Sequence, residues 1–212
     1  MPPKVKVTKK DIINTALDMI RREGEASVNA RSVASALGCS TQPVFSNFAT
    51  MEELQNAVKR AAYDLYLDFL NKEAMSGEYP RYKAFGMAYI RFARDEKELF
   101  KLLFMCERNG EDMSHTVDFE ESVRLIMNAN GISREKAELM HLEIWTCVHG
   151  IGTILATSFL QLEWELISNM VSDVYQGIRA RHSSPRRQLR LLHSLLFGES
   201  IRENFNQSEI LT

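Results

Sequence analysis

The sequence has few of the features that mark membrane, secreted or catalytic proteins. Its 212 residues contain no run near the roughly 18 to 20 apolar residues that cross a bilayer. The first ten residues, MPPKVKVTKK, lack the apolar core of a secretory signal. Only three cysteines occur, far apart and without a CxxC pair, as is typical of a reducing compartment. These absences predict a cytoplasmic protein with no membrane partner.

Catalytic and cofactor motifs are also missing. The chain has no GxSxG, no HExxH, no Walker-type loop and no glycine-rich dinucleotide turn. Cys147 and His149 stand two residues apart, which places them about 200° apart on a helix, so they cannot share a metal ion. We therefore expect neither an enzyme nor a metal or cofactor site.

What is present predicts an all-α protein. Only five prolines occur, and no segment alternates apolar and polar residues as a strand does. The first helix is expected over Lys9–Glu23, with Thr8 as its cap and Asp11 three residues later in a variant capping box. Gly24 is expected to end it.

The segment ALGCSTQPVFSNF predicts a sharp turn followed by a short helix. A second helix is expected over Ala30–Leu37, capped by Asn29, and Gly38 can take the positive φ of the turn. With Ser40 as the next cap, Pro43 falls in a first helical turn, where its missing N–H costs little. The proline therefore marks a helix start.

Two short helices joined by a glycine turn form a helix-turn-helix, whose second helix enters the major groove of DNA. Val44 and Phe48 are expected to face the core, which leaves a polar face outside. Gln and Asn can pair with adenine, and Thr offers a hydroxyl or a methyl group. A plain helical corner with a polar surface is an equal alternative on spacing alone. The candidate DNA-binding residues are Asn29, Arg31, Ser40, Thr41, Gln42, Pro43, Phe45, Ser46 and Asn47.

The charge distribution agrees weakly with a DNA-binding head. Residues 1–60 hold nine Lys and Arg against six Asp and Glu, whereas the remainder holds 17 against 22. A basic segment on an acidic body suggests that the head meets an anion.

Residues 8–55 resemble the DNA-binding domain of the tetracycline-repressor (TetR) family of transcriptional regulators. The similarity rests on the break at Gly24, the RxVAxxLG pattern at Arg31–Gly38 and the FxNF ending at Phe45–Phe48. AYIRFARDEKELFKLLF and IWTCVHGIGTIL resemble the Trp-His-Gly type of regulatory domain in this family. The resemblance implies a helical domain that encloses an effector pocket and dimerises through two long helices, within residues 134–160 and 163–182.

Three positions depart from the family pattern. Phe45, Asn47 and Met51 stand where the family usually has Tyr, His and Lys. By resemblance that Tyr and Lys contact DNA phosphates, which supply much of the affinity. We expect fewer such contacts here, replaced in part by basic and helix-end groups, namely Lys4, Lys6, Lys9, Lys10, Arg31 and the N-terminus of the helix after Thr50.

Aromatic, methionine and histidine residues in the second half are candidates for an effector pocket, and ordinary core packing is the alternative for each. Few charges fall among them, so the expected effector is apolar or aromatic, and a cationic one remains open. The candidate ligand-binding residues are Phe100, Phe104, Met105, Phe119, Met127, His141, Trp145 and His149.

The predicted organisation is a helix-turn-helix domain over residues 1–50, a helical ligand-binding and dimerisation domain over 51–182, and a tail over 183–212. The tail is expected to form an amphipathic helix on its own domain, although the dimer, a groove or a membrane surface is also open. The predicted function is a homodimeric, ligand-responsive regulator, most simply a repressor, of a pseudo-palindromic double-stranded operator. The alternative is a small-molecule-binding or scaffold protein that has lost sequence-specific DNA binding.

Overall fold

The structure, a computed structural model, describes residues 7–107 and 117–183, and the predicted tail helix lies outside them. The described residues are helical with short connections and contain no strand. A short 3-10 helix spans Glu25–Ser27. The α-helices are α1 (Lys9–Glu23), α2 (Ala30–Ala36), α3 (Gln42–Asn47), α4 (Met51–Ser76), α5 (Arg81–Asp95), α6 (Lys97–Phe104), α7 (Val117–Asn130), α8 (Arg134–Ala156) and α9 (Trp164–Ser183).

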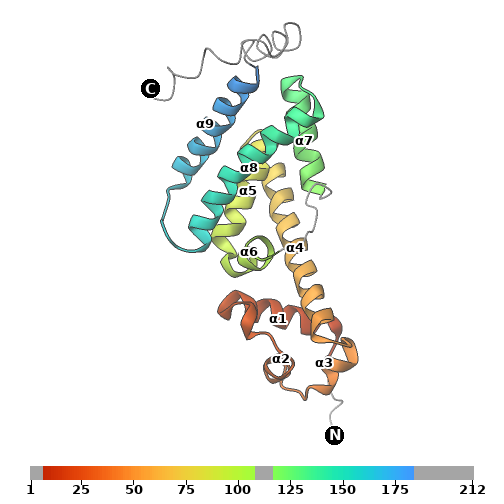
Figure 1. Cartoon of the computed structure of the whole chain (residues 1–212). Coiled ribbons are helices and arrows are strands. Elements are labelled where there is room, and N and C mark those ends of the chain that lie inside the picture. The colour runs from red at the N-terminus through yellow and green to blue at the C-terminus, as the bar shows by residue number, and fades with distance from the viewer. Residues whose placement is uncertain (1–6, 108–116, 184–212) are drawn as a thin grey trace, which may run out of the picture.

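The helices form a small head and a larger body, which α4 connects. Figure 1 shows α1, α2 and α3 gathered at one end and α5 to α9 bundled at the other, with α4 running from one into the other. α4 packs against α1 in the head and against α5 and α6 in the body. One continuous helix therefore belongs to both the head and the body.

The head folds around an apolar stripe on α1. Ile12 and Ala16 are fully buried and Ile20 nearly so, at the i, i+4 and i+8 positions of one helix face. The Thr8 hydroxyl accepts a hydrogen bond from the Asp11 N–H, and the Asp11 carboxylate accepts one from the Thr8 N–H at 2.9 Å. The Thr8 hydroxyl also donates to the Asp11 carboxylate at 2.7 Å. That bond, followed by the one from the Thr8 N–H, lowers the pKa of Asp11. The predicted capping box and its range, Lys9–Glu23, are confirmed.

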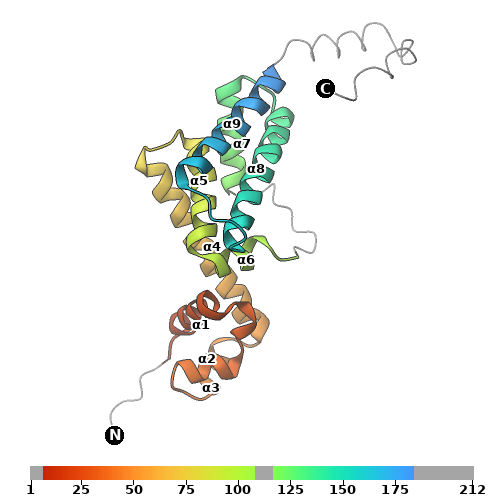
Figure 2. The same cartoon turned by 90° about the vertical axis from the view of Figure 1, so that its left-hand side faces the viewer.

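The body packs around α5, which contacts α4, α6, α7, α8 and α9. Met87, Ile90 and Phe92 are fully buried. In the view of Figure 2, α9 lies against this bundle, beside α5 and α8. α8 is long and apolar enough to cross a membrane by length and composition, but core helices pass the same test. Ala137, Met140 and Ile144 are buried on one side of α8, as in a core helix.

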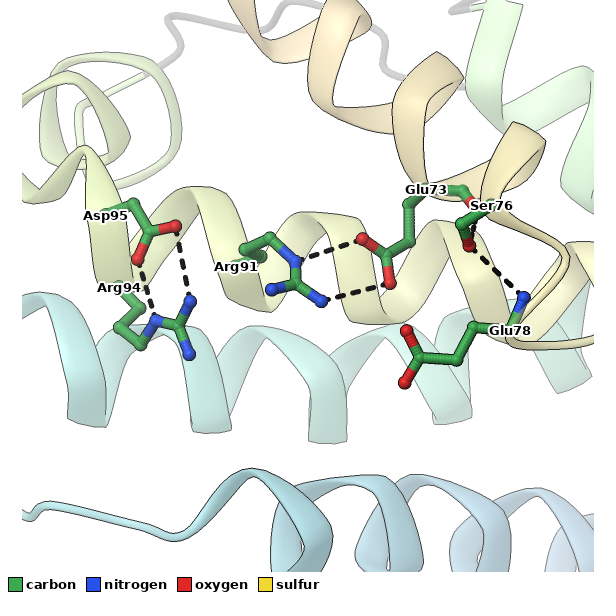
Figure 3. Close-up of polar contacts among 6 residues, drawn as sticks. All are labelled: Glu73, Ser76, Glu78, Arg91, Arg94 and Asp95. Carbon is green, nitrogen blue, oxygen red and sulfur yellow. Dashed lines mark hydrogen bonds and ion pairs between the residues drawn. The ribbon is translucent and has the colours of Figure 1, made fainter.

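A polar cluster ties α4 to α5 at the edge of the body. The Arg91 guanidinium donates to the buried Glu73 carboxylate through Nε at 3.0 Å and through its second nitrogen at 3.2 Å (Figure 3). Arg91 and Arg94 also lie over the Trp164 ring, 4.4 and 4.8 Å from its centroid. The start of α9 is therefore fixed to α5.

Candidate nucleic-acid interface and ligand cavity

The turn between α2 and α3 has the geometry that the sequence predicts. Gly38 takes a φ of 65°, in the region that favours glycine, and the Cys39 N–H donates to the Ala34 carbonyl at 2.9 Å. Val44 and Phe48 are each 1% exposed, so they anchor α3 in the core of the head as expected. α2 and α3 are therefore held together with one side of α3 turned outward.

Two helix boundaries differ slightly from the prediction. α2 ends at Ala36, because Leu37 serves as its C-terminal cap. Thr41, not Ser40, is the residue before α3: its backbone is already helical, and its carbonyl accepts from the Phe45 N–H at 3.2 Å. Pro43 consequently occupies the second helical position, still within the first turn, where no N–H is needed.

Asn29 serves α2 directly. Its Oδ1 accepts hydrogen bonds from the N–H groups of Arg31 and Ser32, at 3.1 and 3.0 Å. The Ser32 hydroxyl completes the capping box by accepting from the Asn29 N–H at 3.0 Å. The amide oxygen of Asn29 is thus used to hold the start of the helix. The Arg31 side chain, in the first turn of α2, is exposed.

The polar side chains of α2, α3 and the turn between them fall into two groups. The Ser46 hydroxyl and the Asn47 amide both turn back onto their own helix, donating at 2.8 Å to the carbonyls of Gln42 and Pro43. Thr41, Gln42 and Arg31 have no side-chain hydrogen bond or ion pair with any residue that the structure describes. These three side chains are available to an outside partner.

Phe45 is the large apolar group on this face, with 51% of its surface exposed. Ser40 is exposed in the turn, and Pro43 is partly buried. Nearby basic groups are limited. Lys9 is paired with Glu53 at 3.1 Å and lies over the Phe48 ring, whereas Lys10 is exposed. Lys4 and Lys6 lie outside the described residues.

The start of α4, which the sequence predicts to replace some of the missing phosphate contacts, carries two carboxylates. Thr50 caps the helix by accepting from the Glu53 N–H at 3.1 Å, and the Glu53 carboxylate accepts from the Ala49 N–H at 2.8 Å. That hydrogen bond, followed by the one from Lys9, lowers the pKa of Glu53 and keeps it charged. Glu52 adds a second negative charge in the same turn, and both oppose an anion.

The body contains a cavity of about 630 Å³, which lies in the size range of small-molecule sites. Its wall comes from α4, α5, α7, α8 and α9 together with Pro80. The wall is mainly apolar and rich in aromatic rings. The aromatic side chains that line it are Tyr66, Tyr82, Phe85, Tyr89, Phe119, Trp145 and Tyr175.

Three of the eight predicted ligand-binding residues line this cavity: Phe119, His141 and Trp145. The Tyr82 hydroxyl and His141 Nδ1 are hydrogen-bonded at 2.9 Å, and the Phe119 ring meets the His141 ring edge to face. Burial, followed by the nearby Tyr175, raises the pKa of Tyr82, so its phenol stays neutral. The Tyr82 hydroxyl and the His141 ring are therefore already hydrogen-bonded to each other at this part of the wall.

The other five predicted residues do not line the cavity. Phe100 and Phe104 belong to an aromatic cluster behind Tyr89, and His149 stacks on Trp145 at 4.8 Å between ring centroids. The packing of Phe100, Phe104 and His149 is that of ordinary core residues, the alternative given for each of them. The remaining two are Met105, which is exposed, and Met127, which is partly buried against the core.

Several lining residues were missed by the sequence analysis. Tyr82, Phe85 and Tyr89 project from successive turns of α5, and Tyr175 projects from α9. Their spacing at i, i+3 and i+7 was a usable signal of one helix face, but it does not distinguish a cavity wall from a solid core.

Head and body also meet directly. The Arg21 guanidinium on α1 donates to both oxygens of Glu96, at 2.9 and 3.1 Å, where α5 passes into α6. A third bond joins Arg21 to Asp18 at 3.0 Å. These bonds raise the pKa of Arg21, with Glu96 as the main cause. An ion pair thus joins α1 to the α5–α6 junction.

Comparison with solved structures identifies the fold. A TetR-like transcriptional regulator from Rhodococcus sp. RHA1 superposes with a TM-score of 0.62 at 12% identity, over 87% of this chain and 100% of that one. A TetR family member from Streptomyces coelicolor A3 gives 0.57 at 14% identity, over 78% and 96%. The chain has the fold of the TetR-type transcriptional regulators.

Sequence comparison adds one distant relative of the chain. An HTH-type transcriptional regulator of Mycobacterium tuberculosis is 23% identical over 159 residues, which is 73% of each chain. No protein-family model matches the sequence. The described part of the chain holds no cluster of His, Cys, Asp or Glu suited to a metal ion. The predicted all-α fold is confirmed.

Proposed function

We propose that the protein is a homodimeric transcriptional repressor that a small molecule releases from its operator. One observation carries the proposal: the outward face of α2 and α3 bears unengaged polar side chains, and α4 joins it to a body with a ligand-sized cavity. The similarity of fold to TetR-type regulators supports the same function.

In this proposal α3 enters the major groove. Gln42 at its start would read a base edge, since a Gln amide can bond adenine at two atoms. Thr41 would offer its hydroxyl or methyl group beside it, and Arg31 would contact a phosphate, which positions the head without reading sequence. Phe45 would meet the groove through apolar contact alone.

The body supplies a surface for a second copy. α8 exposes Leu139, Leu142 and Trp145, and α9 exposes Leu166 and Met170. Large apolar side chains grouped in this way are typical of an interface. A two-fold dimer through these helices would present two recognition helices to half-sites about 34 to 36 Å apart, or a multiple of that.

Release would follow from coupling between the cavity and the head. A ligand that binds one arrangement of the body more tightly than another shifts the dimer toward that arrangement. α4 and the Arg21–Glu96 pair would carry the change to the head and alter the spacing of the recognition helices. A coupling free energy of about 1 to 3 kcal/mol is typical of such systems.

The second candidate is a small-molecule-binding protein that no longer binds DNA specifically. Phe45 lacks a hydroxyl, Met51 lacks a charge, and Lys9 is already paired with Glu53. These features reduce the phosphate contacts that supply affinity.

Selection of sites from a random duplex pool, with full-length protein at two salt concentrations, separates the two. We expect an enriched inverted repeat whose binding weakens as salt rises. Absence of enrichment at both salt concentrations would reject the repressor and favour the small-molecule-binding protein.

A further inference from the structure

The charged groups at the cavity wall have one sign. Among the described residues, no Asp or Glu lines the cavity, whereas Arg81 and Lys83 do. Arg81 is neutralised by the Glu121 carboxylate, 2.6 Å from its Nε. Lys83 has no carboxylate within ion-pair distance in the part of the chain that the structure describes. Lys83 is therefore the one cation of the described wall whose charge no carboxylate balances.

The ammonium of Lys83 is held by neutral oxygen atoms. Its Nζ donates to the hydroxyls of Ser168 and Ser172 on α9, at 2.7 and 2.9 Å, and lies 4.8 Å from the centroid of the Tyr79 ring. Ser172 also lines the cavity, next to Val171 and Tyr175. Hydroxyls and a ring face orient the ammonium but leave its charge in place, at the edge of an apolar space.

An unpaired charge at an apolar wall is costly, and an opposite charge that also accepts its hydrogen bonds removes the cost. A single ammonium matches a monoanion, because a dianion would bring a second unpaired charge into the same apolar space. A ligand carboxylate could accept from Lys83 Nζ. It could also accept from Ser172 Oγ once that hydroxyl turns away from the Ser168 carbonyl, to which it now donates at 3.1 Å. A cationic ligand would be repelled.

We propose that the cavity binds an amphipathic monocarboxylate, with its apolar body among the aromatic side chains and its carboxylate on Lys83 and Ser172. This inference rests on the proposed function, because it names the chemical class of the effector. It narrows the sequence-based expectation of an apolar, aromatic or cationic ligand to an anionic one.

The test is calorimetric titration of the full-length protein with matched pairs that differ only in the head group. Dodecanoate is compared with dodecanol, and naphthylacetate with naphthylethanol. For at least one pair we expect the acid to bind roughly 10-fold or more tightly than the alcohol. Lys83→Met should abolish that preference, and Lys83→Arg should keep part of it. Lys72→Met removes an exposed lysine of α4 and should behave like the parent.

Circular dichroism and a thermal melt establish that each variant is folded. Should Lys83→Met not fold, Ser172→Ala takes its place: it should weaken binding of the acid several-fold and leave the alcohol unchanged. Equal affinity for acid and alcohol, or a preference that survives Lys83→Met, would overturn the inference while leaving a neutral effector in the cavity. Failure of every probe to bind would also overturn it, and DNA-site selection without ligand judges the repressor separately.

Discussion

A Cβ atom added at Gly152 would lie 3.0 Å from Cζ of Phe100 and 3.3 Å from the Cβ of Ala93. Phe100 is fully buried, so its ring has little room to withdraw. The absence of a side chain at Gly152 is therefore what lets α8 approach α5 and α6 closely. Gly150, two residues earlier, has nothing within 4 Å of the same built atom.

The two glycines should respond oppositely to alanine. We expect Gly152→Ala to lower the free energy of unfolding by about 1 to 3 kcal/mol through overpacking. Gly150→Ala should leave it unchanged or raise it by up to about 1 kcal/mol, because alanine favours a helix. Urea denaturation at one fixed protein concentration measures both, since a dimer's stability depends on concentration. A shift of the same sign in both variants would contradict the packing described for Gly152.

Two substitutions separate base reading from phosphate contact on the proposed DNA-binding face of α2 and α3. Gln42→Ala should weaken binding to the selected operator by about 1 to 3 kcal/mol, with little effect on random duplex. Arg31→Ala should weaken binding to both and lower the salt slope by about 1. Titrations of labelled duplexes over a salt series measure these effects, with Gln161→Ala in the α8–α9 connection as control. If both variants bind DNA as the parent protein does, the DNA-binding face lies elsewhere.

Two substitutions, Phe45→Tyr and Met51→Lys, would restore the groups that contact DNA phosphates in the family pattern. Phe45→Tyr adds one neutral hydroxyl on the exposed face, so affinity should rise by about 0.5 to 1.5 kcal/mol with an unchanged salt slope. Met51→Lys adds a charge, so affinity should rise and the slope should increase by about 1. The same salt series distinguishes them. If neither variant binds more tightly, these positions do not face the phosphates.

The Glu73–Arg91 pair should be strongly coupled. Arg91→Met leaves the buried Glu73 carboxylate without its partner and removes one cation from the Trp164 ring. We expect a loss of about 2 to 4 kcal/mol in unfolding free energy, below the fully buried value because Arg91 is 30% exposed. Glu73→Leu combined with Arg91→Met should recover at least about 1 kcal/mol of it. A double-mutant cycle by urea denaturation measures the coupling, and strictly additive losses would argue against it.

The head was predictable because its signals are local. Thr8, Asp11 and Gly24 fix the ends of α1 through contacts within a few residues, and the turn at Gly38 needs only its own backbone. The start of α3 was misplaced by one residue because Ser40 and Thr41 are both plausible caps. What decides between them is the Thr41 carbonyl, which accepts a hydrogen bond from the Phe45 N–H at the start of α3.

The cavity was only partly predictable because it depends on packing between five helices. Periodicity marks Phe100 and Phe119 alike as apolar, yet one fills the aromatic cluster and the other faces the cavity. Lys83 looked like any surface lysine, because its partners Ser168 and Ser172 lie more than 80 residues away in the sequence. Chemistry that arises between distant segments leaves no local pattern.

The continuity of α4 also makes the head sensitive to small rotations. Its 26 residues, at about 1.5 Å each, form a rod about 39 Å long. A tilt of about 5° at the body end would carry the far end through about 3 Å, close to the length of one hydrogen bond. A base contact tolerates little of that displacement. Under the proposed function, α4 would act as a lever, and a shift of a fraction of an ångström at the cavity would be enough to break a contact in the groove.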